Sequence, residues 1–416
     1  MKALLSAYAC EPGLGSEPGV GWNWVRQIAR FHDVWVLTQN EGQREIESAL
    51  AVQPIPRARF IYLDLPAWAR FWKKGRRGAQ LHYYLWQVGA FFVARRLHRE
   101  VRFDLIHHVT FVRYWTPTFL ALLPIPFIWG PVGGGESSPR AFLSTFSLRG
   151  RIYERVRDLG RWLGEHDPFV RQTARKAVLG LATTEETAKR MRALGCPTVE
   201  VLPAVALAEE EIEELGKLPL RTAPPFRVLS LGRLLHLKGF HLGLEAFAEL
   251  QRAVPESEYW LTGDGPERKR LERLAHRLGL DGKVRFWGAV TRARALELLA
   301  ECDLLLHPSF HDSGGYVCVE AMAVGRPVVC LDLGGPALQV TEETGIKVPA
   351  ISPEQAVRDL AAAIYKLAAD PDLRARMGQA GRQRVEQHFN WESKASAMME
   401  IYKAVGRSAS TETRRT

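Results

Sequence analysis

The chain has 416 residues, of which 46% are hydrophobic and 25% charged, and its formal net charge is +10. This composition is that of a soluble globular protein, and the length exceeds one hydrophobic core, so two domains of roughly 200 residues each are expected. The positive charge favours an anionic partner: a nucleotide phosphate, an anionic lipid surface or a nucleic acid. The five scattered cysteines predict buried free thiols in a reducing cytoplasm.

Short β-rich segments alternate with helix-length segments along the whole chain. This alternation predicts α/β domains, each a doubly wound parallel sheet with helices on both faces. The strands expected in the first half cover 2–8, 33–39, 59–65, 104–109, 126–130, 177–183 and 198–203. Those expected in the second half cover 226–232, 257–263, 283–288, 302–308, 327–332 and 345–349. The segment 2–8, at the start of the first half, is expected to be a buried strand rather than a signal sequence.

The acidic and then proline-rich segment 208–225 is typical of a linker. We therefore expect a first domain over 1–207 and a second over 226–389, with a ligand-binding cleft between them. Residues 390–405 predict a C-terminal helix, and 406–416 a polar tail.

Two cations follow the first strand of the second half. Arg233 comes directly after this strand, and Lys238 follows five residues later. Ligands of parallel sheets bind at the carboxyl ends of the strands, so both cations are expected at the cleft. A guanidinium and an ammonium there can neutralise a diphosphate and the charge that develops as it leaves. A solvated basic loop is the alternative.

A helix start in the second half places two carboxylates around a glycine pair. Asp312 precedes Gly314 and Gly315, and Glu320 lies about one turn inside the following helix. Because glycine has no side chain, backbone amides and the helix N-terminus are expected to face the cleft, where they favour phosphate. Glu320 can accept hydrogen bonds from a ribose diol, and Asp312 from a second set of hydroxyls. A capped helix with two surface acids is the alternative.

The ordered series of motifs resembles the donor half of glycosyltransferase family 4, retaining enzymes of the GT-B fold. The motifs are "GRLLHLKGFHLGLEAF", "LTGDGPERKRL", "VRFWGAV" and "HPSFHDSGGYVCVEAMAVGRPVV", and the N-terminal "SAYACEPGLGSEPGVGWNW" is similar to a bacterial branch of group 1 type. The resemblance implies sugar transfer from a nucleotide-diphosphate sugar with retention at the anomeric carbon, and neither a metal nor another cofactor. In this fold two Rossmann-like domains face each other across a cleft, and a C-terminal helix returns to the first domain.

The resemblance also implies roles for individual residues. Arg233 and Lys238 resemble the pair that holds the donor diphosphate, and Glu320 resembles the acid on the nucleotide ribose. Asp312 stands where the family usually has a glutamate and is expected to contact the donor sugar. The further residues expected to bind the donor are Gly15, Gly232, Gly263, Gly265, Val290, Ser313, Gly314, Gly315, Tyr316 and Val317.

The first half is expected to hold the acceptor. Its glycine-rich loop 11–22, which contains Gly15, can let a diphosphate approach from the other wall of the cleft. A Rossmann dinucleotide site with Glu41 as the ribose acid is the alternative, but the glycine spacing departs from that fingerprint.

Two histidines, His107 and His108, end the strand 104–109. Alternation places them on opposite faces of the sheet, so only one can enter the cleft, and by resemblance we expect His108 to do so as a catalytic residue. The residues expected on the acceptor side are His107, Gly134 and Glu136, with an ordinary helix-entry acid as the alternative for Glu136.

Several other patterns do not indicate a metal site, a membrane span or a nucleic-acid-binding module. The Asp-Pro-Asp of 370–372 lies between two helices and predicts a helix cap rather than a metal site. His307 and His311 flank a proline, so they do not form a helical metal pair. Prolines interrupt the uncharged segment 115–135, which excludes a membrane span. No nucleic-acid-binding module is recognisable.

Residues 67–99 combine eight Arg or Lys and eight aromatic residues with no acid. This pattern favours docking on anionic lipid headgroups, with a core-packing helix as the alternative. We therefore expect a cytoplasmic enzyme, peripheral on the inner membrane face, whose acceptor is a lipid-linked or cell-envelope glycan. The alternative functions are a nucleotide-sugar epimerase of the same fold and a non-catalytic carbohydrate- or lipid-surface binding protein.

Overall fold

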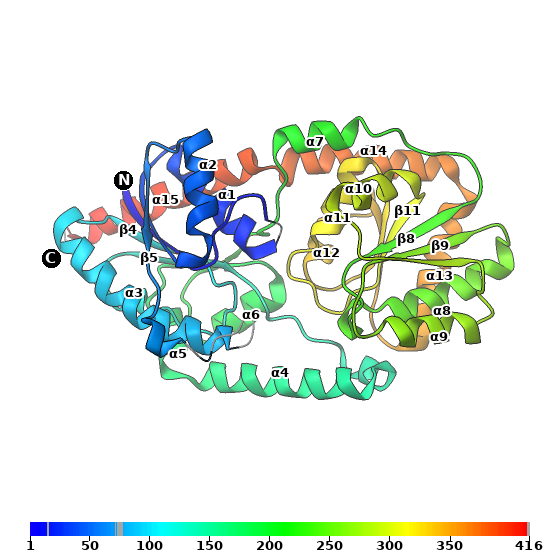
Figure 1. Cartoon of the computed structure of the whole chain (residues 1–416), viewed down its shortest axis with the longest axis horizontal. Coiled ribbons are helices and arrows are strands. Elements are labelled where there is room, and N and C mark those ends of the chain that lie inside the picture. Colours follow the sequence, from blue (N-terminus) through cyan, green and yellow to red (C-terminus); the bar gives the residue numbers. More distant parts are fainter. Residues whose placement is uncertain (15, 71, 73–77, 414–416) are drawn as a thin grey trace. The chain divides into compact units, whose positions relative to one another are not determined.

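The computed structural model describes residues 1–14, 16–70, 72 and 78–413 (Figure 1). The chain forms two compact units. Unit 1 contains Met1–Gly135, Asp158–Ala204 and the chain from Trp391. Unit 2 contains Glu136–Arg157 and Val205–Asn390.

Unit 1 is built on a seven-stranded parallel sheet with the order β3-β2-β1-β4-β5-β6-β7. Its central strands are buried along almost their whole length, as expected when helices cover both faces. The strand order reverses between β1 and β4, which makes the carboxyl ends of these two strands the topological switch point. The strands are β1 (Lys2–Ala7), β2 (Asp33–Thr38), β3 (Ala58–Tyr62), β4 (Leu105–Thr110), β5 (Phe127–Val132), β6 (Leu179–Ala182) and β7 (Val199–Val201).

The α-helices that precede Val205 in the chain are α1 (Ser16–Ala29), α2 (Gln43–Val52), α3 (Ala79–Val101), α4 (Leu148–His166), α5 (Pro168–Lys176) and α6 (Glu185–Ala193). Helix α4 begins in unit 2 and ends in unit 1. Each strand predicted for this half is present, and the first one is buried as predicted.

Unit 2 has a six-stranded parallel sheet with the order β10-β9-β8-β11-β12-β13, so its switch point lies between β8 and β11. The strands are β8 (Arg227–Leu231), β9 (Glu258–Thr262), β10 (Val284–Gly288), β11 (Leu304–His307), β12 (Val328–Leu331) and β13 (Gly345–Val348). The helices are α7 (Glu209–Gly216), α8 (Phe240–Ala253), α9 (Arg268–Arg277), α10 (Arg292–Glu301), α11 (Tyr316–Val324), α12 (Gly334–Gln339), α13 (Pro353–Ala369) and α14 (Pro371–His388). All strands predicted for this half form.

Two segments differ from the boundaries expected from the sequence. The expected linker 208–225 contains helix α7, whose Ile212 and Leu215 are buried in the core of unit 2. Residues 136–157 group with unit 2 and not with the rest of the first half. Their buried Phe142 and Phe146 pack into the core of unit 2, which explains the grouping.

The last helix, α15 (Trp391–Thr413), belongs to unit 1. Trp391 packs edge to face on Trp24 of α1, with ring centroids 5.5 Å apart. The hydroxyl of Tyr402 donates to Nδ1 of His107 at 2.8 Å. The helix extends to Thr413, so most of the expected polar tail is helical, and residues 414–416 lie outside the described residues.

All five cysteines are buried free thiols, as predicted. Among the described residues, no helix combines the length and the apolar character needed to cross a bilayer.

Candidate functional site

The carboxyl ends of β8 and β11 in unit 2 carry most of the residues predicted to bind the donor. Glycines allow the loops that follow β8 and β9 to pack backbone against backbone. Gly263 has a φ of 127°, and a Cβ atom there would lie 2.0 Å from the carbonyl oxygen of Gly232. A Cβ atom on Gly265 would lie 2.5 Å from the carbonyl oxygen of Leu234. Any side chain at these positions would therefore push the loop of Arg233 and Lys238 out of place.

Lys238 and Asp312 form an ion pair across the switch point. Nζ of Lys238 lies 2.5 Å from Oδ2 of Asp312, and less than a fifth of either side chain is exposed (19% and 18%). Nε2 of His307 lies 3.2 Å from the same oxygen. Burial alone would raise the pKa of Asp312, but the Lys238 ammonium and the His307 contact outweigh it, so this pKa lies well below its usual value.

The sequence led us to expect that the glycine pair exposes its backbone amides, but both amides are hydrogen-bonded within the loop. Oδ1 of Asp312 accepts hydrogen bonds from the amides of Gly314 at 3.2 Å and Gly315 at 2.8 Å. This Asx-type turn satisfies the two donors internally. The amides of Tyr316 and Val317, at the start of α11, have no acceptor within the described part of the chain.

Arg233 is exposed, and its guanidinium has no ion-pair partner among the described residues. The short 3₁₀ helix His236–Lys238 then turns the chain back, so that Arg233 and Lys238 leave the same loop. The two predicted cations therefore differ at rest: Lys238 is bound to a carboxylate, whereas Arg233 is free to bind an anion.

Glu320 is buried and bound to Arg292, a residue that the sequence did not single out. Nη2 of Arg292 donates to Oε1 of Glu320 at 2.9 Å, and the same guanidinium binds Glu211 of α7. Burial raises the pKa of Glu320, and Arg292 only partly offsets this effect. Glu320 thus lies one turn into α11, as expected, but its carboxylate already has a cationic partner.

A second carboxylate that the sequence did not reveal, Glu154 of α4, links the two loops of the site. Its Oε1 contacts Nε2 of His236 at 2.8 Å and Nε2 of His311 at 3.1 Å. Burial would raise the pKa of Glu154, but the two imidazoles outweigh it and lower the pKa. Glu154 therefore fixes the loops that carry Lys238 and Asp312.

Four other predicted donor residues belong to loops or helices that follow strands of unit 2. Ser313 donates to Oε2 of Glu136 at 2.7 Å. The hydroxyl of Tyr316 donates to the carbonyl of Ala206 at 3.2 Å, and Val317 is buried in the core. Val290 is half-buried after β10.

Glu136 was assigned from sequence to the acceptor side, but it lies in unit 2, where it is buried against Ser313. Gly134, in unit 1, has a φ of 90°, and a Cβ atom there would meet the Trp115 ring at 2.7 Å. Its role in the structure is thus a close approach to an indole. Gly15 lies outside the described residues.

Unit 1 has a pocket of about 840 Å³ at its own switch point, between the ends of β1 and β4. Tyr8, Glu17, Phe111 and Arg113 line it, together with the start of α3. Burial raises the pKa of Glu17, although its carboxylate accepts a hydrogen bond from the amide of Val112 at 2.8 Å. A carboxylate, a guanidinium and aromatic rings are groups that bind a polar ring compound.

The two histidines of β4 point to opposite sides, as alternation predicts. His107 donates from Nε2 to the carbonyl of Gly130 at 2.5 Å and accepts from Tyr402, so it anchors α15. His108 donates from Nε2 to the carbonyl of Phe111 at 3.0 Å, and its ring lies near Tyr83 of α3. Both are buried, and neither lines the pocket directly.

Burial lowers the pKa of His107 and that of His108 to about 4, from 6.5. Between these values the unfolded chain binds more protons than the folded one, so we expect the free energy of unfolding to fall as the pH falls from 7 toward 4. Each histidine should contribute about 3 kcal/mol to this loss. Urea unfolding at several pH values measures it.

His108→Gln should flatten this pH dependence, because the variant has no imidazole to protonate at this position. His276→Gln is the matched control, since His276 is exposed and pairs with Asp281 at the surface. An equally steep loss of stability in the His108 variant would contradict the assignment.

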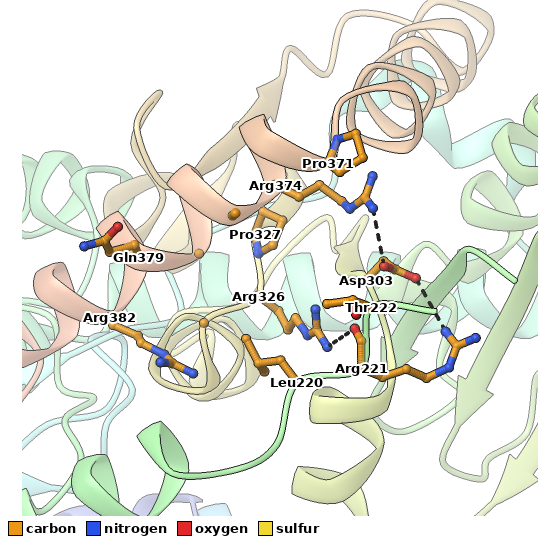
Figure 2. Close-up of a pocket in the computed structure, with 13 residues that line it drawn as sticks. Leu220, Arg221, Thr222, Asp303, Arg326, Pro327, Pro371, Arg374, Gln379 and Arg382 are labelled. Carbon is orange, nitrogen blue, oxygen red and sulfur yellow. Dashed lines mark hydrogen bonds and ion pairs between the residues drawn. The ribbon is translucent and has the colours of Figure 1, made fainter. Parts of the chain in front are cut away.

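A further pocket in unit 2, of about 510 Å³, lies at the opposite, amino edge of the sheet (Figure 2). It is lined by four arginines, but each has a structural partner. Arg326 donates to the carbonyls of Ala300 and Arg221, and Arg382 to that of Val324. Asp303 pairs with Arg374 at 3.7 Å and with Arg221 at 4.0 Å. These arginines hold loops and helix ends together, so this pocket is not our candidate site.

Within the described residues, no group of three His, Cys, Asp or Glu side chains could hold a metal ion. The Asp-Pro-Asp segment is a helix cap, as predicted: the Asp370 side chain accepts from the amide of Leu373, and Pro371 begins α14.

Residues 213–384 match the family described as Glycosyl transferases group 1. The lipopolysaccharide core biosynthesis glycosyltransferase LpsD of Rhizobium meliloti (strain 1021) is 33% identical over 224 residues, which are 53% of this chain and 62% of LpsD. The chain thus aligns with less than two thirds of this relative.

Two solved structures share the fold along nearly the whole chain. Sucrose-phosphate synthase from Thermosynechococcus elongatus has a TM-score of 0.67 at 20% identity and covers 98% of this chain and 99% of its own. HepE of Anabaena in complex with UDP-glucose has a TM-score of 0.60 at 19% identity, with 97% and 100% covered. Residues 213–384 thus match the group 1 glycosyl transferases, in a chain that has the GT-B fold.

Proposed function

We propose that the protein is a retaining glycosyltransferase of the family 4 type. It moves a sugar from a nucleotide-diphosphate sugar to a hydroxyl of a lipid-linked or cell-envelope glycan, and it needs no metal. The observation that carries the proposal is the ion pair of Lys238 with Asp312 at the switch point of unit 2, which joins the loop that also carries Arg233 to the loop before α11, the helix of Glu320. The relative LpsD is a lipopolysaccharide core glycosyltransferase, which supports a glycan acceptor.

The donor diphosphate binds Arg233, which is free, and Lys238, which exchanges Asp312 for a phosphate oxygen. The open amides of Tyr316 and Val317 add a helix N-terminus to the same site. Glu320 accepts hydrogen bonds from the ribose hydroxyls, either after Arg292 has moved away or through the carboxylate oxygen that Arg292 does not bind. Uridine-diphosphate sugars are the first donors to test, because HepE was solved with UDP-glucose.

In the reaction, the bond between the anomeric carbon and the diphosphate oxygen breaks, the acceptor hydroxyl attacks from the same face, and its proton passes to an oxygen of the leaving diphosphate. The negative charge that develops on the leaving diphosphate is stabilised by the cations and backbone dipoles that already surround the diphosphate in the donor complex. Asp312, released from Lys238, orients hydroxyls of the donor sugar. The acceptor binds in the pocket of unit 1, where His108 holds Phe111 in position.

We also propose that the enzyme is cytoplasmic and works at the inner face of the membrane. The segment 67–99 supports this: helix α3 exposes four large apolar side chains at helical spacing, followed by exposed arginines. They are Leu81, Leu85, Val88 and Phe92, and then Arg95, Arg96 and Arg99. Residues 71 and 73–77 of this segment lie outside the described residues.

The test is a panel of nucleotide sugars, ranked by the thermal shift that each produces, followed by turnover of the best binder with a membrane glycolipid extract. We expect release of free nucleoside diphosphate and a mass increase of the acceptor by one sugar, both unchanged by EDTA. A nucleotide-sugar epimerase would change the donor without any acceptor. A non-catalytic binding protein would release no diphosphate. A strict need for a divalent metal would contradict the proposed mechanism.

A further inference from the structure

Helix α4 exposes a continuous line of large apolar side chains. Its five members, here called the α4 stripe, follow one another at intervals of four, four, three and four residues, which places them on one face of a helix. Each of them is between 52% and 67% exposed. They are Leu148, Ile152, Val156, Leu159 and Leu163. Trp162, which is 53% exposed, lies beside this line.

The opposite face of α4 is held against the protein. Glu154 binds His236 and His311, and a Cβ atom on Gly150 would meet the ring of His236 at 2.8 Å. Arg161, on the same face, is nearly buried. Because these contacts fix the rotation of the helix, the α4 stripe faces outward. Nothing in the described part of the chain covers it.

The charges on the exposed side of α4 are mostly positive. Arg149 lies on one flank of the stripe, and Arg151 and Arg155 lie on the other, all of them exposed. Of the three acids of the helix, Glu154 is buried, Asp158 pairs with Arg161, and Glu165 pairs with Arg190. An apolar line between flanking arginines, with a tryptophan beside it, has the composition of a helix that lies in the plane of a lipid interface.

We propose that α4 lies flat on an anionic bilayer surface, with the α4 stripe among the acyl chains and the three arginines at the phosphates. A second copy of the chain fits this face less well, because its arginines would oppose like charges. The α4 stripe is also longer than the apolar face of α3. The proposal extends the transfer reaction proposed above to its place of action, and its test does not depend on turnover.

The experiment is co-sedimentation of the purified full-length protein with vesicles of phosphatidylcholine alone or mixed with phosphatidylglycerol. We expect binding to the mixed vesicles and little to the neutral ones. The stripe variant should bind the mixed vesicles at least about tenfold more weakly, since each serine removes a large apolar contact. This variant is Ile152→Ser, Val156→Ser and Leu159→Ser combined.

The matched control removes three equally exposed apolar side chains elsewhere and should bind as the wild type does. It combines Val52→Ser, Ile351→Ser and Tyr365→Ser. The charge variant Arg151→Glu and Arg155→Glu should lose binding to mixed vesicles, whereas Arg44→Glu and Arg252→Glu, with the same change of net charge, should retain most of it. Thermal unfolding and circular dichroism check that every variant is folded.

Wild-type binding by the stripe variant would overturn the proposal, and so would equal binding to neutral and anionic vesicles. A wild-type dimer that the stripe variant loses, without vesicle binding, would assign the face to a second copy and also overturn it. Loss of binding only on Leu85→Ser, Val88→Ser and Phe92→Ser would place the lipid contact on α3 instead. If the wild type releases nucleoside diphosphate but does not bind vesicles, the membrane proposal is wrong and the proposed transferase function is unaffected.

Discussion

Replacement of Lys238 by alanine should lower the rate of sugar transfer by about 100- to 1000-fold while the protein remains folded. The ammonium is the less exposed cation of the proposed diphosphate site, and in the proposed donor complex it faces the oxygen that gains negative charge when the sugar leaves. The effect should appear mainly in kcat, because Arg233 still binds the diphosphate in the ground state. Steady-state kinetics with the best donor from the panel measures both constants.

The same substitution should lower the free energy of unfolding by about 1 to 3 kcal/mol, because it leaves the Asp312 carboxylate without its ammonium. The amides of Gly314 and Gly315 still stabilise this carboxylate, so the loss stays moderate. Lys347→Ala is the matched control, because Lys347 also pairs with an aspartate of unit 2 but lies away from the switch point. Full activity of the Lys238 variant would remove Lys238 from the reaction.

Replacement of Glu320 by alanine should raise the KM for the donor by about 10- to 100-fold, the value of one charge-assisted hydrogen bond to the ribose. Arg292 should stay in place, since Glu211 also binds it. Glu320→Gln should recover part of the affinity, because an amide oxygen still accepts one hydrogen bond. Kinetics at varied donor concentration separates this binding effect from any change in kcat.

Glu301→Gln is the control for the loss of a paired glutamate, because Glu301 binds Arg294 in the same unit. It should leave the donor KM unchanged. An equal rise of KM in both variants would indicate a general loosening of unit 2 rather than a ribose contact. An unchanged KM in the Glu320 variant would exclude that contact.

The strands could be predicted from the sequence because each is a short apolar run between helix-length segments, a local pattern. The order of the residues around the donor site was equally visible, since Arg233, Lys238, Asp312 and Glu320 each follow a strand. Parallel topology then brings such residues to one edge of the sheet.

What the sequence did not reveal depends on long-range pairing. Glu154 contacts His236, which is 82 positions away, and Arg292 contacts Glu320, which is 28 positions away. No local spacing in the sequence indicates such partners. The amides of Gly314 and Gly315, which we expected to be open, are occupied for a different reason. The Asp312 side chain is short enough to fold back and accept hydrogen bonds from the amides that follow it. The sequence also did not show that Glu136 groups with unit 2, because a helix entry looks the same whichever core it joins.

Helix α15 closes unit 1 through the pairs Trp391 with Trp24 and Tyr402 with His107. During synthesis, the residues of unit 2 up to Asn390 emerge before these partners do. The sheet of unit 1 therefore lacks these contacts until α15 has been synthesised, which happens after the residues of unit 2. Until then the nascent sheet of unit 1 is incompletely packed, a state in which exposed apolar surface favours chaperone binding.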